Sequence, residues 1–197
     1  MSVTTVSSKK VQQLKQSARN LKRDQAIHHT EALELVAREA GFKNWHQITK
    51  ANSLVLPAEL ALKSGCIIAI DIKDGLKHHK ELTEDGTFIE DTFLAMVCED
   101  SFRKMLATSP NPDDELGRLF HETLTAEDFN EWFWFQLGNH TYFRLNENVS
   151  VDSVNDVIKL HDSKLVWHEP VFYVWFRGLL YESDKNYKDP MPIFGHR

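Results

Sequence analysis

The residues best suited to binding chemistry are the cations of one short N-terminal segment. Lys15, Arg19 and Lys22 are separated by four and three residues, so they form one stripe along a helix. Arg23 follows directly, and Lys43 adds a further cation downstream. A row of cations on a helix can neutralise the phosphates of a nucleic acid. We therefore predict that these five residues form a nucleic-acid-binding site.

An apolar stripe runs beside the cationic one. Its residues recur at gaps of three, four and three: Val11, Leu14, Ala18 and Leu21. This periodicity predicts an amphipathic helix over residues 8–23 that packs by one face and presents cations on the next. A solvated basic face and a protein-docking module have the same pattern, so both remain alternatives to nucleic-acid binding.

A second candidate for chemistry is the sequence Asp71-Ile72-Lys73, which ends an apolar run. The carboxylate and the lysine suit a metal-dependent nuclease, in which the acid holds Mg²⁺ and the lysine steadies the attacking water. Such a site needs another acid upstream, and Glu59 is the nearest one. The alternative is structural: a strand leaves the core and becomes polar.

Charge is distributed unevenly along the 197 residues. Residues 1–50 carry nine Lys or Arg against four Asp or Glu, a formal charge of +5. The remaining residues carry 14 bases against 25 acids, a formal charge of −11. We predict a basic three-helix module over 8–50 and an acidic domain over 58–190. The expected joint is Ala51–Pro57, because proline disfavours helix in the residue before it.

The basic module should contain two further helices. Thr30 is the predicted N-cap of the second helix. Gly41 is the predicted left-handed residue that ends it. Phe42, Trp45 and Ile48 then recur every three residues, which predicts a short third helix. Three helices with an Ala-rich middle one are compatible with a helix-turn-helix.

Residues 14–46 combine a basic helix, the pattern His-x-x-Ala-Leu-x-x-x-Ala from His29 to Ala37, and Gly-Phe-x-x-Trp from Gly41 to Trp45. This stretch resembles a short helical N-terminal segment of bacterial plasmid and other mobile-element proteins, and of some glyoxalase-superfamily proteins. The resemblance implies a bacterial accessory protein and transfers no catalytic residue. Residues 51–197 resemble no family.

Glyoxalase-type enzymes use His and Glu as metal ligands, which draws attention to the histidines. A site could be assembled from His121, Glu122, His140, His168 and Glu169. The zincin pattern His-Glu-x-x-His is absent from the sequence, and scattered surface histidines are the favoured interpretation. We therefore assign no catalytic residue, no metal ligand and no cofactor, and an enzyme is the less favoured class.

The acidic domain mixes strands and helices without a regular βαβ order, which predicts an α+β fold. The expected strands are 66–73, 140–145 and a central one at 171–177. The expected helices are 88–106, about 125–135 and 152–161, with a strand over 93–98 as an alternative within the first of them.

Two cysteines, no N-terminal apolar segment and no apolar run near 20 residues predict a cytoplasmic protein that does not enter membranes. The leading hypothesis is an accessory protein that acts by binding. Its basic module would contact nucleic acid or a partner, and its acidic domain would bind a host protein. The alternatives are a divalent-metal enzyme, nuclease-like or glyoxalase-like, and an inhibitor or antitoxin-like module. The oligomeric state stays open.

Overall fold

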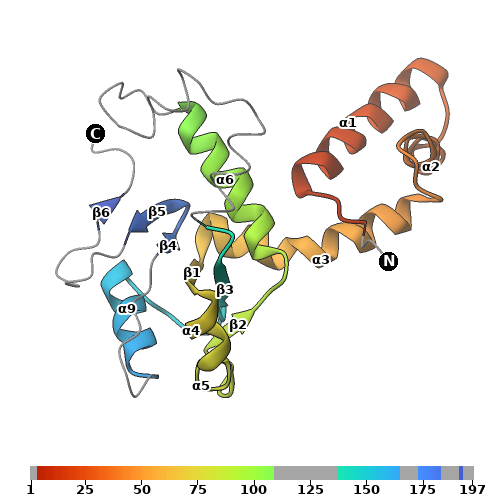
Figure 1. The fold of residues 1–197 in the computed structure, drawn as a ribbon. Helices are drawn as coiled ribbons and strands as arrows, with labels where there is room; N and C mark the ends of the chain where they lie inside the picture. The colour runs from red at the N-terminus through yellow and green to blue at the C-terminus, as the bar shows by residue number, and fades with distance from the viewer. Residues whose placement is uncertain (1–3, 109–136, 165–172, 183–190, 193–197) are drawn as a thin grey trace. The chain divides into compact units, whose positions relative to one another are not determined.

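A computed structural model describes residues 4–108, 137–164, 173–182 and 191–192. The chain divides into two compact units, Met1–Glu59 and Leu60–Arg197, and the division falls within a helix. Each unit has its own apolar core. Helices fill the first unit and an antiparallel sheet with helices forms the second, so the predicted α+β fold is confirmed (Figure 1).

The first unit is built from helices α1 (Ser8–Gln25), α2 (His29–Glu39) and α3 (Trp45–Ser64). The predicted apolar stripe of α1 is its inner face, since Val11, Leu14 and Ala18 are buried. They share one core with Ala32 and Val36 of α2 and with residues from the start of α3. The period of the apolar residues therefore dictates how α1 docks.

The end of α2 was predicted correctly and its beginning was not. Gly41 has φ +86°, and its N–H donates to the carbonyl of Arg38 while that of Phe42 donates to Ala37. These two bonds make a Schellman motif, for which glycine is the favoured residue. The N-cap, however, is His28, not Thr30, and its side chain makes no capping hydrogen bond. The helix starts two residues early, so Thr30 lies inside it.

The predicted joint at 51–57 is wrong, because α3 continues through Pro57. Val55 and Ala58 on either side of the proline are completely buried. The unbroken helix also brings Asn52 and Glu59 to the start of α1. There the Asn52 amide donates to the Val6 carbonyl at 3.0 Å, and the Glu59 carboxylate accepts from the Ser8 N–H at 3.0 Å. These contacts offset the hydrogen bond that proline removes.

The second unit is organised around a six-stranded sheet of order β2-β3-β1-β4-β5-β6, in which every neighbouring pair is antiparallel. The strands are β1 (Cys66–Asp71), β2 (Phe88–Glu90), β3 (His140–Leu145), β4 (Tyr173–Phe176), β5 (Leu179–Glu182) and β6 (Met191–Pro192). The expected strands at 140–145 and at the sheet centre are confirmed. Both faces of β1 are buried, consistent with its apolar sequence.

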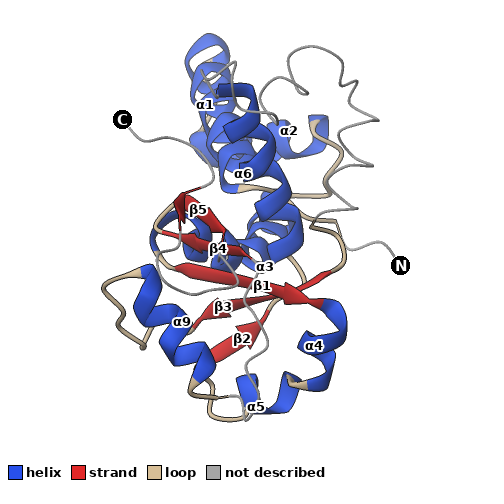
Figure 2. Ribbon diagram, turned by 60° about the vertical axis from the view of Figure 1, so that its left-hand side comes forward, coloured by secondary structure: helices blue, strands red, loops and turns tan. Residues whose placement is uncertain are grey.

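Helices cover both faces of this sheet. Ile68 of β1 lies opposite Phe143 of β3 and Val174 of β4, and these side chains form one core with α9 (Val154–Asp162). The other face carries Tyr142 and faces α6 (Leu94–Thr108), whose Cys98 lies near that phenol. Figure 2 shows α6 on one side of the strands and α9 on the other.

Several helices and strands of the second unit begin or end at residues other than those expected from the sequence. Residues 72 and 73 belong to helix α4 (Ile72–Lys77), which α5 (His79–Thr83) follows, so the strand expected over 66–73 ends at Asp71. The helix expected over 88–106 is confirmed from Leu94 onward, after strand β2. The helix expected over 152–161 is confirmed as α9, which begins at Val154 with Ser153 as its N-cap. The helix expected near 125–135 and the first two residues of the strand expected at 171–177 lie outside the described residues.

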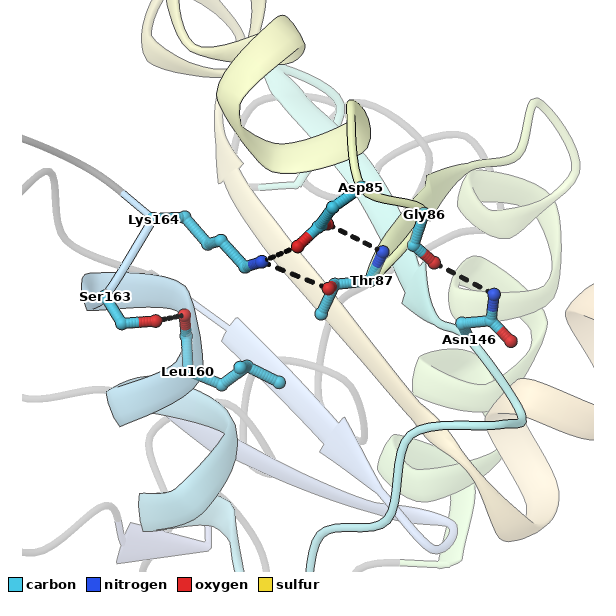
Figure 3. Close-up of polar contacts among 7 residues, drawn as sticks. All are labelled: Asp85, Gly86, Thr87, Asn146, Leu160, Ser163 and Lys164. Atoms are coloured by element: carbon cyan, nitrogen blue, oxygen red, sulfur yellow. Dashed lines mark hydrogen bonds and ion pairs between the residues drawn. The ribbon is translucent and has the colours of Figure 1, made fainter.

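A polar cluster joins the end of α9 to the turn before β2. The Lys164 ammonium contacts the Asp85 carboxylate and donates to the Thr87 hydroxyl at 3.1 Å (Figure 3). The Thr87 N–H donates to the same carboxylate, and the Asn146 amide donates to the Gly86 carbonyl at 2.9 Å. The turn is therefore held to residues distant in sequence.

Across the described parts of the chain, no helix is both long and apolar enough to cross a bilayer.

Candidate nucleic-acid interface

The predicted cationic stripe occupies the outer side of α1. Arg19, Lys22 and Arg23 are exposed, and Lys15 is half-buried. In the apolar stripe beside them, Val11, Leu14 and Ala18 are buried and Leu21 is half-buried. Lys15 and Lys22 are seven residues apart, close to two turns of about 3.6 residues each, so they lie one above the other. The helix carries six Lys or Arg against one acid, Asp24.

Three of the predicted residues line one hollow. An open hollow of about 560 Å³ is lined by Arg19, Lys22 and Arg23 of α1 and by His29, the first residue of α2. Lys15 and Lys43 are not among its lining residues. The structure thus brings together three of the five predicted cations and adds a histidine that sequence reasoning missed. The sequence marked His29 only by its place after the short break that follows α1 and as the first residue of the His-x-x-Ala-Leu pattern.

Two of these cations have neighbours on their own helix. The Arg23 Nε contacts the Asp24 carboxylate at 3.1 Å, and both side chains are largely exposed. The Arg19 guanidinium donates to the Gln16 side-chain oxygen at 3.4 Å. An exposed ion pair of this kind contributes little to stability. Asp24 therefore offsets part of the local positive charge, while the Arg23 side chain stays exposed to solvent.

Lys43 lies apart from the hollow, in the turn between α2 and α3. Its side chain is exposed, and its backbone N–H donates to the Gln47 side-chain oxygen at 2.8 Å. This bond orders the entry into α3, next to the Trp45 N–H, which donates to the Glu34 carboxylate at 3.3 Å. The local geometry gives Lys43 a fixed backbone and a side chain open to solvent.

The acids considered for a nuclease site make capping contacts. The Asp71 carboxylate accepts from the Lys73 N–H at 2.8 Å and caps α4, and Glu59 receives the Ser8 N–H in the first unit. Lys73 stands in the first turn of α4, so it does not extend from the strand as the nuclease pattern requires. The expectation that Asp71, Ile72 and Lys73 form one strand end was wrong, because the capping carboxylate starts a helix there.

Of the histidine set, His140 is the member within the described chain. It lies opposite Asp71 in the sheet, with its ring 5.5 Å from that of Tyr173. Burial lowers the pKa of His140, and the nearby Asp71 partly opposes this shift. His121, Glu122, His168 and Glu169 lie outside the described residues. Within the described ranges, no three His, Cys, Asp or Glu side chains gather as a metal site would require.

The two thiols are unsuited to nucleophilic attack. Cys66 and Cys98 are both buried, and neither is in a disulfide. Burial raises the pKa of Cys66 to about 12 and that of Cys98 well above its usual value. Since the thiolate is the reactive form, both cysteines act as small core residues.

Comparison with known proteins gives one match. A family model described as "glyoxalase superfamily protein" matches residues 4–65, which are the three N-terminal helices. The match covers less than a third of the chain and ends where β1 begins. No curated protein and no solved structure matches the chain.

Proposed function

We propose that this protein acts by binding, and that its first unit contacts the phosphate backbone of a nucleic acid through the outer side of α1. The observation that carries this proposal is the stripe of Lys15, Arg19, Lys22 and Arg23, displayed beside the apolar stripe by which α1 docks. A helix docked by one face can place its cations along a polyanion without any change in fold. Lys43 supplies a further cation from the turn before α3.

The magnitude of the local charge supports phosphate as the ligand. Lys15, Arg19, Lys22 and Arg23 lie within nine residues of one helix with a single acid, Asp24, so the local field is positive although the whole chain has a formal charge of −6. Backbone contacts of this kind are independent of base sequence, and their strength comes mainly from released counterions. The proposal therefore concerns affinity for phosphate and does not assign sequence specificity.

The second unit is proposed to bind a protein partner through its acidic surface. Residues 60–197 carry 14 bases against 24 acids, a formal charge of −10, and complementary charge accelerates and orients association with a basic partner. The two proposals are independent, because the cationic stripe belongs entirely to residues 15–23.

The decisive experiment measures binding of a fluorescent DNA duplex to the full chain by anisotropy across a salt series. If four cations each neutralise one phosphate, the slope of log K against log salt is about −3.6. The triple variant Lys15→Glu, Arg19→Glu and Lys22→Glu should abolish binding. The control Lys9→Glu, Lys10→Glu and Lys50→Glu makes the same charge change at exposed positions of the same unit and should retain most of the affinity.

Two outcomes would contradict the proposal. Unchanged affinity in the Lys15, Arg19 and Lys22 variant would show that the stripe does not hold the duplex. Equal loss in both variants would show that only net charge matters. If neither duplex DNA nor single-stranded RNA binds but a poly-glutamate peptide does, the cationic face recognises an acidic protein, and nucleic-acid binding is rejected.

A further inference from the structure

The hollow beside α1 is lined by three permanent cations and a histidine. Arg19, Lys22 and Arg23 come from the second half of α1, His29 comes from the start of α2, and among the residues that the structure describes no carboxylate lines the hollow. We infer that this hollow is a preformed site for two adjacent phosphate groups. Such a pair occurs in a free diphosphate and along a nucleic-acid strand. The inference rests on the proposed function, since it names the point of the cationic face at which phosphate is held.

The donors in the hollow remain available to a ligand. Arg23 uses its Nε hydrogen on Asp24, so its two terminal nitrogens keep their four N–H donors. Arg19 contacts Gln16 through one terminal nitrogen, at the long distance of 3.4 Å. Lys22 adds three rotatable donors. Guanidinium groups bind phosphate oxygens in pairs, so this set can hold several oxygens at once.

The number of donors favours two phosphates over one. Two guanidinium groups that each bind a pair of oxygens, together with one ammonium, can hold five oxygens. A single phosphate ester has only three terminal oxygens to offer. The hollow is open, with a volume of about 560 Å³, so it has room for a second phosphate group beside the first.

Negative groups nearby limit the expected affinity. Asp24 contacts Arg23 from α1, and Glu31 lies in the first turn of α2, two residues after His29. Both acids are exposed, so their repulsion of a bound anion is screened by solvent and salt. Neither lines the hollow. We therefore expect binding that weakens as salt rises and that is restored at low ionic strength.

The test uses the full chain and pyrophosphate as the probe, with calorimetry for affinity. Arg19→Gln, Lys22→Gln and Arg23→Gln together should weaken pyrophosphate binding at least about tenfold, because charged hydrogen bonds are lost. Lys9→Gln, Lys10→Gln and Lys50→Gln remove the same charge from exposed positions outside the hollow and should change it less than about twofold. The ring signals of His29, identified with a His29→Asn variant, should shift in NMR spectra when pyrophosphate is added.

Three results would overturn the inference. Equal weakening in both triple variants would show attraction to net charge alone. Inorganic phosphate or sulfate binding as tightly as pyrophosphate would exclude a site for two phosphates. Unshifted His29 signals at saturation would place the anion elsewhere.

Competition between ligands separates this inference from the proposed function. If pyrophosphate and a nucleoside diphosphate bind in the hollow but DNA and RNA do not bind the protein, the site stands and its ligand is a free diphosphate, while the proposed function fails. If a nucleic acid binds and saturating pyrophosphate at constant ionic strength does not displace it, the hollow is not its phosphate site, while the proposed function stands.

Discussion

Asp85 is the residue whose ionisation is most strongly tied to the fold of the second unit. Its carboxylate receives the Lys164 ammonium and the Thr87 N–H (Figure 3). These contacts stabilise the charged form, with Lys164 as the largest cause, and hold the pKa of Asp85 well below its usual value of 3.8. The carboxylate is exposed, so its effect on stability is expected to be modest and sensitive to salt.

A lowered pKa in the folded state fixes the sign of the pH dependence. Folding favours the ionised carboxylate, so the stabilisation is present above the unfolded-state pKa of about 3.9 and is lost as pH falls below it. We predict that Asp85→Asn lowers the free energy of unfolding at neutral pH. The difference between the wild type and this variant should shrink as pH falls below about 4. Urea unfolding at a series of pH values measures that difference.

Two further variants isolate the lysine contact. Lys164→Gln should raise the pKa of Asp85 toward its ordinary value, as read from the carboxyl carbon shift in NMR titrations. Glu84→Gln removes a neighbouring negative charge and leaves the contact with Lys164 in place, so the pKa of Asp85 should stay low. A normal pKa for Asp85 in the wild type would show that the lysine does not act on this carboxylate.

At the scale of elements, local periodicity and local turn chemistry were enough to predict the faces of α1, the position of β1 and the end of α2. The stripes of α1, the apolar run of β1 and the glycine that ends α2 each depend on residues close in sequence. The cationic stripe of the candidate site was predictable for the same reason, because helical spacing alone places Lys15, Arg19 and Lys22 on one face.

Features that depend on distant residues were not predictable from the sequence. Gly75 lies in α4, where an added Cβ would lie 2.6 Å from the Thr141 side chain of β3. The short helix therefore has a glycine because α4 approaches the sheet closely. His29 joins the hollow only because α2 folds back beside α1, which the spacing within α1 does not reveal.

Pro57 is the clearest case in which packing overrides local preference. Proline lacks the N–H that would donate to the Ser53 carbonyl, and its ring crowds that carbonyl, at a cost of about 3 kcal/mol inside a helix. We predict that Pro57→Ala raises the free energy of unfolding, by about 2 kcal/mol once the greater freedom of the unfolded chain is subtracted. Urea unfolding followed by circular dichroism measures the change.

Pro57→Gly is the matched control for this prediction. It also restores the N–H, but glycine is about 1 kcal/mol less favourable than alanine within a helix, so its gain should be smaller. A loss of stability in Pro57→Ala would contradict a continuous α3. It would instead favour the break at 51–57 that the sequence alone predicts.

At the scale of the whole molecule, the formal charge of −6 conceals two opposite regions. The formal charge of +5 on residues 1–50 offsets part of the formal charge of −11 on the remainder, so a property that depends only on net charge would not distinguish the two regions. The affinity of the full chain for a nucleic acid should therefore depend on which region carries a charge substitution, and not only on the change in net charge. A variant of the cationic stripe therefore needs a control variant that makes the same change in charge elsewhere in the first unit.

The two cores give the chain two sources of cooperativity. Ile48 is fully buried in the core of the first unit and Ile68 is fully buried in that of the second. Because these clusters share no residue, each unit should unfold in its own transition, although α3 spans their boundary. We predict that differential scanning calorimetry of the full chain resolves two transitions.

Matched core variants assign the two transitions. Ile48→Val and Ile68→Val each remove one buried methylene, at a cost of about 1 kcal/mol. Each should lower the midpoint of one transition, by roughly 4–8 °C for the smaller first unit and by roughly 2–4 °C for the larger second unit, and leave the other in place. A single transition that both substitutions lower equally would show that α3 couples the units into one cooperative structure. In that case, the cationic module could not open or rearrange without unfolding the sheet.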